Sequence, residues 1–319
     1  MFGSLDALPS LPLAATATPI EEMPRLAAAL GRAPRLLIKR DDTIGFAFGG
    51  NKVRKMRYVA AAALRQGADV LITTGGVQSN HARVTAAAAA RLGMRCVLVV
   101  NGAPPGRLSG NALLDSLLGA EVRYVAAREE RASAMVEAAE ELRRAGHRPY
   151  VIPLGASTPL GAAAYVDALR ELLGQTDPPD AIVHATSSGG TQAGLAAGCA
   201  LAGVATRVLG ISADQPAAAL EGDIRPILAG LGPLLQLARD LTSTPLAVDD
   251  RFVGAGYGVP TDESREAIEL TARTEAIFLD PTYTAKAMAG LVAAIRRGEF
   301  EASQTVLFWH TGGQVGLFA

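Results

Sequence analysis

Short apolar runs alternate along this chain with longer segments whose apolar residues recur at helical spacing. Strands are predicted at 35–40, 69–74, 96–100, 121–125 and 149–153 and, after Asp-Pro-Pro-Asp at 177–180, at 181–185, 207–213, 276–280 and 305–310. Helices are predicted near 23–30, at 51–66, 81–92, 111–118, 128–145, 192–202, 216–240, 261–274 and 284–297. Apolar strands that alternate with helices are typical of parallel sheets covered on both faces. The pattern therefore predicts an α/β fold with two parallel sheets.

Composition narrows the class of protein. The chain has 319 residues, of which 49% are hydrophobic and 19% charged, as in a globular protein with room for two domains. A formal net charge of −1 gives no reason to expect nucleic acid or an anionic membrane as a partner. The N-terminus shows no signal-peptide pattern and no apolar run is long enough to span a membrane, so we expect a cytoplasmic protein.

The sequence gives no indication of a metal site or a disulfide framework. Cys96 and Cys199 each lie in an apolar segment, where we expect them to be buried as small hydrophobic side chains. The histidines, which are His81, His147, His184 and His310, lack metal-ligand spacing. No metal is therefore expected.

The stretch Gly-Gly-Asn-Lys-Val-Arg-Lys at 49–55 is the strongest candidate for chemistry. Adjacent glycines allow another group to approach the backbone closely. A lysine desolvated behind them would have a lowered pKa and a nucleophilic amine, which suits Lys52. Lys55 shares its helix face, so one lysine would hold a carbonyl cofactor while the other faces its phosphate. A solvated basic helix start is the alternative.

Two loops after predicted strands are suited to binding anions. Ser79 and Asn80 begin a helix after the strand at 69–74, and Ser-Ser-Gly-Gly-Thr at 187–191 leads from a strand into another helix. Free N–H groups and the dipole at a helix N-terminus favour an anion such as a carboxylate or a phosphate. The alternatives are a plain N-cap at the first loop and a tight packing turn at the second.

Three further residues lie in loops near predicted strands or helices. Tyr257 and Tyr283 would stack on a ligand ring or transfer a proton, or else pack locally. Thr311 follows the strand at 305–310 beside two glycines, where its hydroxyl would bond to a heteroaromatic nitrogen or simply cap the strand.

Taken together, these motifs resemble the D-cysteine desulfhydrase/1-aminocyclopropane-1-carboxylate (ACC) deaminase family of pyridoxal-phosphate enzymes. The resemblance rests on Ile-Lys-Arg-Asp-Asp at 38–42, the lysine motif at 49–55, Gln-Ser-Asn-His-Ala-Arg at 78–83, Ser-Gly-Gly-Thr-Gln-Ala-Gly-Leu at 188–195, Tyr-Gly-Val-Pro at 257–260, Leu-Asp-Pro-Thr-Tyr-Thr-Ala-Lys-Ala at 279–287 and His-Thr-Gly-Gly at 310–313. The ordered set is specific and covers nearly the whole chain. It implies a tryptophan-synthase-β-like fold (fold type II) and a homodimer. A small domain at 55–157 would be inserted into a large cofactor-binding domain formed by 1–54 and 158–319.

The resemblance also implies roles for individual residues. Lys52 would hold pyridoxal phosphate covalently and act as the base at Cα of a small amino-acid substrate, with Ser79, Tyr257 and Tyr283 as further catalytic residues. The implied cofactor-binding residues are Lys52, Lys55, Asn51, Asn80, Ser188, Gly189, Gly190, Thr191, Tyr283 and Thr311. The implied substrate-binding residues are Ser79, Asn80, His81, Tyr257 and Thr284.

Two positions separate the branches of the family. Ring-opening deaminases resemble one another in a glutamate and a leucine where this chain has Thr284 and Thr311. A hydroxyl near the ring nitrogen stabilises a carbanion less than a carboxylate does, which favours loss of a good β-leaving group. We therefore expect α,β-elimination of D-cysteine to pyruvate, hydrogen sulfide and ammonia. The alternatives are ACC deaminase, L-cysteate sulfo-lyase, a non-catalytic pyridoxal-phosphate-binding protein and a cofactor-free metabolite-binding module.

Overall fold

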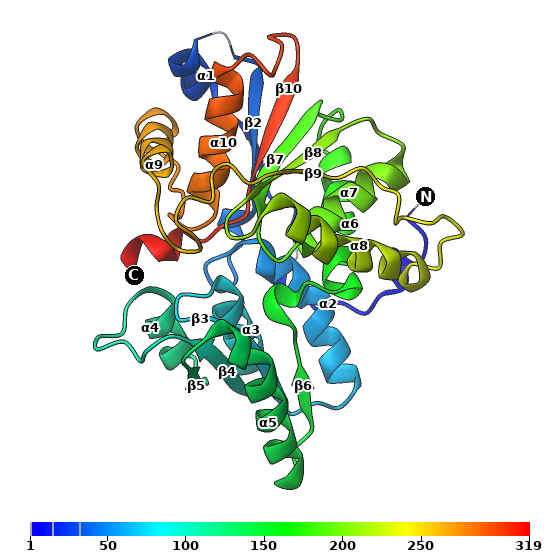
Figure 1. Cartoon of the computed structure of the whole chain (residues 1–319). Helices are drawn as coiled ribbons and strands as arrows, with labels where there is room; N and C mark the ends of the chain where they lie inside the picture. Colours follow the sequence, from blue (N-terminus) through cyan, green and yellow to red (C-terminus); the bar gives the residue numbers. More distant parts are fainter. Residues whose placement is uncertain (1, 15, 32) are drawn as a thin grey trace.

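The computed structural model describes residues 2–14, 16–31 and 33–319, which form two sheets with helices around each (Figure 1). The strands are β1 (Ile20–Glu22), β2 (Arg35–Arg40), β3 (Val70–Gly76), β4 (Arg95–Asn101), β5 (Glu121–Val125), β6 (Pro149–Val151), β7 (Ala181–Thr186), β8 (Arg207–Ser212), β9 (Ala247–Asp249) and β10 (Thr305–His310). The helices are α1 (Pro24–Leu30), α2 (Asn51–Arg65), α3 (Asn80–Leu92), α4 (Gly110–Leu117), α5 (Arg131–Arg144), α6 (Pro159–Leu173), α7 (Gly190–Ala202), α8 (Ala217–Leu234), α9 (Asp262–Glu275) and α10 (Thr284–Arg296).

Both sheets are dominated by parallel pairs, which confirms the predicted α/β class. The larger sheet has the strand order β1-β2-β10-β7-β8-β9, and the smaller sheet has the order β5-β4-β3-β6. The described pairs are all parallel except β1 with β2, which is antiparallel. Because parallel strands end at the same edge of a sheet, the loops that follow them are brought together there.

The larger sheet is buried on both faces. Ile38 and Val183 point to the face covered by α1, α9 and α10, whereas the neighbouring Leu37 and Ile182 point to the face covered by α6 and α7. Successive side chains of a strand alternate between faces, so a fully apolar strand supplies both layers of core. Helix α8 packs outside α6 and α7.

The smaller sheet repeats this arrangement with its own helices. Leu71 and Leu98 lie in a cluster with residues of α2 and α3, and Ile72 and Val97 lie in a second cluster with residues of α5. Figure 1 shows this sheet and its helices below the larger sheet, with α2 beginning near the larger sheet and running down beside β6 of the smaller one. The packing of α2 on the smaller sheet supports the proposed inserted domain at 55–157, which stays a proposal.

The predicted strand at 276–280 is wrong. These described residues form no β-pair; Ile277 and Leu279 are instead buried against the core below α9 and α10. The apolar run therefore indicates burial but not pairing: the carbonyl oxygen of Phe278 lies 3.0 Å from Nε2 of the His310 side chain instead of joining a strand ladder. The short strands β1 and β9, of three residues each, lie at the sheet edges and were not predicted.

The described residues contain no helix long and apolar enough to cross a membrane. Cys96 and Cys199 are buried free thiols, and burial raises the pKa of Cys199 to about 12. Within the same residues, no cluster of three or more His, Cys, Asp or Glu side chains is arranged to hold a metal.

Candidate active site

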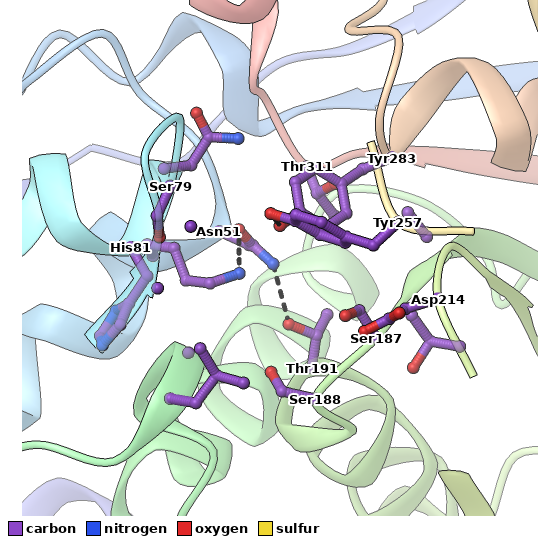
Figure 2. A pocket seen from close by; sticks show the side chains of 18 of the residues that line it. Asn51, Ser79, His81, Ser187, Ser188, Thr191, Asp214, Tyr257, Tyr283 and Thr311 are labelled. Carbon is purple, nitrogen blue, oxygen red and sulfur yellow. Dashed lines mark hydrogen bonds between the residues drawn. The ribbon is translucent and has the colours of Figure 1, made fainter. Parts of the chain in front are cut away.

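A cavity lies where the carboxyl ends of strands from both sheets meet the start of α2. Its wall includes residues that follow β3, β4, β7, β8 and β10, as expected for a ligand site in a parallel α/β fold. Figure 2 shows Ser79 and His81 on one side of this cavity and Tyr257, Tyr283 and Thr311 on another. Segments far apart in the sequence thus converge on a single site.

The start of α2 is held against the end of β10. The N–H of Asn51 donates to the carbonyl oxygen of Thr311 at 3.0 Å, and the N–H of Gly50 donates to that of Asp41 at 2.8 Å. Gly50 has a φ of +99°, and a Cβ built there would lie 2.8 Å from the Thr311 oxygen. A glycine is therefore required, because no L side chain fits this conformation and this close approach.

Lys52 lines the cavity, and its amine is part of a hydrogen-bonded series of side chains. Its Nζ donates to Oδ1 of Asn51 at 3.1 Å, and Nδ2 of Asn51 donates to the Thr191 hydroxyl at 3.1 Å (Figure 2). Burial, and then the positive charge of Arg83, lower the pKa of Lys52 to about 8, with Asp280 opposing them. About one tenth of the amine is therefore neutral at pH 7, far more than for an ordinary lysine, and the neutral form is the one that a nucleophile or a base requires.

The N-terminus of α3 forms the side of the cavity opposite the two tyrosines. Ser79 caps the helix by accepting a hydrogen bond from the N–H of Ala82 at 3.2 Å, and it also lines the cavity. Burial, and then the charge of Lys52, hold the pKa of His81 well below its usual range, and its Nε2 lies 2.8 Å from the Thr73 hydroxyl. His81 is thus neutral. Ser79 both caps α3 and lines the cavity, so its capping role is compatible with binding a ligand at this helix end.

The loop after β7 forms a cradle at the N-terminus of α7. Gly189 has a φ of +76°, and the Ser188 hydroxyl lies 2.8 Å from that of Ser157. A Cβ on Gly190 would lie 2.8 Å from the Ser157 hydroxyl and 2.8 Å from Nζ of Lys55. Ser187, Ser188, Gly189 and Thr191 line the cavity at this helix N-terminus, where small residues, hydroxyls and the helix dipole suit a phosphate.

Three predicted site residues, Lys55, Gly190 and Thr284, do not line the cavity. Nζ of Lys55 donates to the carbonyl oxygen of Gly155 at 3.0 Å and to the Ser157 hydroxyl at 3.3 Å, so Lys55 lies behind the cradle. Thr284 is fully buried, and its hydroxyl donates to Asp280 at 2.7 Å. Asp280 also accepts hydrogen bonds from the first N–H groups of α10, so Thr284 helps to cap that helix and is not positioned to bind a substrate.

The two predicted tyrosines meet at the cavity wall. The hydroxyls of Tyr257 and Tyr283 lie 2.5 Å apart, and their rings pack edge to face with centroids 5.7 Å apart. Burial raises the pKa of both hydroxyls. Each tyrosine therefore keeps its hydroxyl proton at neutral pH. The hydrogen bond between the two hydroxyls is a path along which a proton can pass from one tyrosine to the other.

Sequence reasoning missed several residues of the cavity wall. The missed residues include Asn101, Arg128, Arg131, Thr186 and Asp214. Asn101, Thr186 and Asp214 lie at or just after the carboxyl ends of strands, a signal that could have found them. The two arginines lie in a charged segment that reads as a solvated helix start, and only the tertiary structure places them at the cavity.

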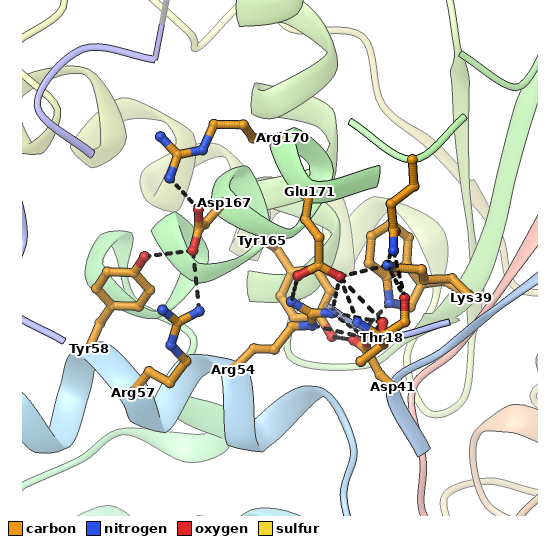
Figure 3. Close-up of polar contacts among 12 residues, drawn as sticks. Thr18, Lys39, Asp41, Arg54, Arg57, Tyr58, Tyr165, Asp167, Arg170 and Glu171 are labelled. Atoms are coloured by element: carbon orange, nitrogen blue, oxygen red, sulfur yellow. Dashed lines mark hydrogen bonds and ion pairs between the residues drawn. The ribbon is translucent and has the colours of Figure 1, made fainter. Parts of the chain in front are cut away.

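A buried charged network supports the start of α2 (Figure 3). Its members include Thr18, Lys39, Asp41, Arg54, Tyr165, Glu171 and Trp309. Asp41 accepts hydrogen bonds from Arg54, Tyr165 and Trp309 at 2.7–2.9 Å, and Glu171 accepts one from Arg54 at 2.8 Å. Burial would raise the pKa of Glu171, but Arg54 and Lys39 lower it to about 2. Through Arg54, two residues after Lys52, the network ties α2 to Glu171 of α6 and, by way of Asp41, to Trp309 of β10.

Comparison with known proteins agrees with this geometry. The family model described as "Pyridoxal-phosphate dependent enzyme" matches residues 11–312. The chain is similar to a solved ACC deaminase homologue, with 38% identity, a TM-score of 0.91, and coverage of 100% of this chain and 97% of that one. Its fold is also shared by a pyridoxal 5'-phosphate-dependent aspartate racemase (17% identity, TM-score 0.69, coverage 93% and 90%) and by the T.th. threonine deaminase (23% identity, TM-score 0.66, coverage 93% and 92%).

The residues of the cavity fit pyridoxal phosphate. Lys52 presents an amine with a lowered pKa, and the cradle at Ser188–Gly190 has no room for a side chain at Gly190. The buried Thr186 hydroxyl lines the cavity and has no hydrogen-bond partner within the described part of the chain, so it is available to a ligand. The chain therefore belongs to the pyridoxal-phosphate-dependent enzymes of fold type II, in the D-cysteine desulfhydrase/ACC deaminase family.

Proposed function

We propose that this lyase catalyses α,β-elimination from a β-substituted amino acid, with D-cysteine as the favoured substrate. In the reaction the Cα proton passes to a base and the β-substituent leaves with its bonding electron pair. The resulting enamine is hydrolysed by water to pyruvate and ammonia, and D-cysteine additionally releases hydrogen sulfide. Atoms and electrons balance without an oxidant or reductant.

Bound pyridoxal phosphate supplies the electron sink for the carbanion at Cα. Lys52 is the residue suited to bind the cofactor covalently and to move the Cα proton, because its amine is partly neutral near pH 7. Ser79 and Asn80, at the N-terminus of α3, would bind the substrate carboxylate. Ser188 and Thr191 would hold the phosphate at the N-terminus of α7. Fixing both ends of the reactants lowers the entropic part of the barrier.

Thr311 is the observation that carries the choice of elimination. It lines the cavity at the end of β10, where its hydroxyl would face a bound ring nitrogen and where the ring-opening deaminases resemble one another in a leucine. A hydroxyl does little to keep that nitrogen protonated, so the electron sink suits a good leaving group better than ring opening. Thr284 no longer supports this choice, because its hydroxyl is bonded to Asp280.

Keto-acid release by the cofactor-loaded enzyme tests the proposal. D-cysteine, L-cysteine, L-cysteate and ACC should be compared in parallel, with Lys52→Ala as the inactive control. We expect pyruvate and sulfide from D-cysteine. Release of 2-oxobutyrate from ACC at a higher kcat/KM would contradict the proposal and favour the deaminase.

We also propose that the enzyme is a homodimer. Phe48 and Leu117 are 59% and 74% exposed, and they line one apolar groove with Phe46 and Leu114. Phe318, 75% exposed, belongs to the C-terminal turn that packs on α4. An apolar surface of this kind marks an interface between proteins more often than a free surface. Light scattering after gel filtration should give twice the chain mass for the native protein and a smaller mass for Leu117→Asp; a native monomer would contradict the proposal.

A further inference from the structure

Two arginines line the mouth of the cavity and differ in how their charges are compensated. Arg128 lies in the 3₁₀ turn Arg128–Glu130, and Arg131 is the first residue of α5. Arg128 connects the loop after β5 of the smaller sheet to the loop after β8 of the larger sheet. Its two terminal nitrogens donate to the carboxylate of Asp214 at 2.9 and 3.4 Å. The charge of Asp214 is therefore already matched by Arg128.

Arg131 has no such partner. Across residues 2–14, 16–31 and 33–319, no carboxylate oxygen lies within 4.0 Å of its guanidinium. Its Nε donates to the backbone oxygen of Arg128 at 2.9 Å, and one terminal nitrogen makes only a long contact of 3.4 Å to Asn101. Burial, and then the charge of Arg128, lower its pKa. A half-buried guanidinium is thus held in place at the cavity with much of its donor capacity free.

The other anion sites of the cavity are assigned to different groups. The N-terminus of α7 suits the cofactor phosphate, and the N-terminus of α3 suits the substrate carboxylate. Arg131 reaches the cavity from a third direction, beyond the end of β4, beside Asn101. A half-buried guanidinium that makes no ion pair has N–H donors available to a ligand of opposite charge.

We propose that Arg131 binds an oxyanion on the substrate side chain, so that the enzyme accepts β-substituted amino acids carrying a sulfonate as well as D-cysteine. This inference rests on the proposed elimination, whose substrate class it extends. Arg128 already donates to both carboxylate oxygens of Asp214, so that carboxylate is not the partner of the Arg131 guanidinium. The planar fork of Arg131 would hold two oxygens of the side-chain oxyanion.

The kinetic test compares two substrates that differ in the charge of the leaving group. Cysteate, tested as both enantiomers, loses sulfite together with the Cβ–S bonding pair, and β-chloroalanine loses chloride without an oxyanion. Arg131→Gln should lower kcat/KM for cysteate by about 10- to 100-fold, mainly through KM. It should change kcat/KM for β-chloroalanine by no more than about twofold.

Arg144→Gln is the matched control, since Arg144 is an exposed arginine in the last turn of the same helix. It removes the same charge away from the cavity and should leave both substrates unaffected. Arg131→Lys keeps the charge without the planar fork and should recover part of the cysteate activity. Equal losses on both substrates with Arg131→Gln, or no loss on cysteate, would overturn the inference.

A binding measurement separates this inference from the proposed reaction. Calorimetric titration of the cofactor-loaded enzyme with succinate and with butyrate, neither of which can react, should give about tenfold tighter binding of succinate. Arg131→Gln should abolish that difference. If succinate binds more tightly than butyrate only when Arg131 is present, but the enzyme eliminates no β-substituent, the oxyanion site at Arg131 is supported and the proposed elimination is overturned. Elimination from β-chloroalanine without any preference for succinate would support the reaction and overturn the site.

Discussion

The hydroxyls of Tyr257 and Tyr283 lie 2.5 Å apart in the wall of the cavity, although 26 positions separate the two residues in the chain. Tyr283 lies immediately before α10, where its N–H donates to Asp280 at 2.9 Å. The cap of α10 therefore sets the position of one hydroxyl and, through it, the position of the other.

Removing either hydroxyl should impair proton transfer more than folding. Tyr257→Phe and Tyr283→Phe should each lower kcat by about 100-fold if the pair moves a proton in the reaction. Tyr124→Phe, on β5 and outside the cavity, serves as the control and should leave kcat unchanged. Steady-state kinetics and thermal melts should be measured together. A fall in melting temperature without a fall in kcat would assign the pair a structural role only.

Lys52 should control the pH dependence of cofactor uptake. Its amine must be neutral to attack an aldehyde, and its pKa is lowered from 10.5 to about 8. The rate of pyridoxal-phosphate incorporation into apoprotein should therefore rise with pH up to about 8 and level off above it. Absorbance after rapid mixing measures this rate. A rate that continues to rise tenfold per pH unit to pH 10 would mean that Lys52 has an ordinary pKa.

Gly190→Ala should weaken cofactor binding. The added Cβ would lie 2.8 Å from the Ser157 hydroxyl and 2.8 Å from Nζ of Lys55, so the cradle must shift. Overpacking of this kind costs about 1–3 kcal/mol, which corresponds to a loss of affinity of about 5- to 150-fold. Titration of the apoprotein with pyridoxal phosphate measures the affinity.

Gly222→Ala is the matched control for that substitution. Gly222 lies within α8, and a Cβ there meets no atom within 4 Å, so alanine should stabilise the helix by about 0.5–1 kcal/mol without changing affinity. Equal cofactor affinities for the two variants would contradict the assigned role of the cradle.

Asp41→Asn should strongly destabilise the fold. Asp41 is fully buried and accepts hydrogen bonds from Arg54, Tyr165 and Trp309. Removing its charge leaves Arg54 with a weakened partner, and breaking a buried pair typically costs about 3–5 kcal/mol. Urea unfolding of the apoprotein measures the loss. Asp262→Asn, which breaks an exposed pair with Arg265, should change stability by less than about 1 kcal/mol.

The sequence by itself determined the strand–helix alternation and the local chemistry of each motif. Apolar runs such as 96–100 formed buried parallel strands, because a strand covered on both faces needs apolar residues at every position. The glycines around Lys52 and the serine before α3 likewise have local roles that their side chains dictate. The resemblance of the motifs to a known family then predicted the cofactor, pyridoxal phosphate.

Only the tertiary structure decided which groups share the cavity. The run at 276–280 is apolar enough for a strand, but it joins no sheet, and its Phe278 carbonyl oxygen lies 3.0 Å from Nε2 of the buried His310, a contact that no local sequence signal predicts. Thr284 and Lys55 have side chains that could bind a ligand. In the structure, however, the Thr284 hydroxyl donates to Asp280 and the Lys55 amine donates to the Ser157 hydroxyl. Arg131 reads as a solvated charge in its own helix. It becomes part of the site because β4 and α5 bring it beside Asn101, a contact between residues 30 positions apart.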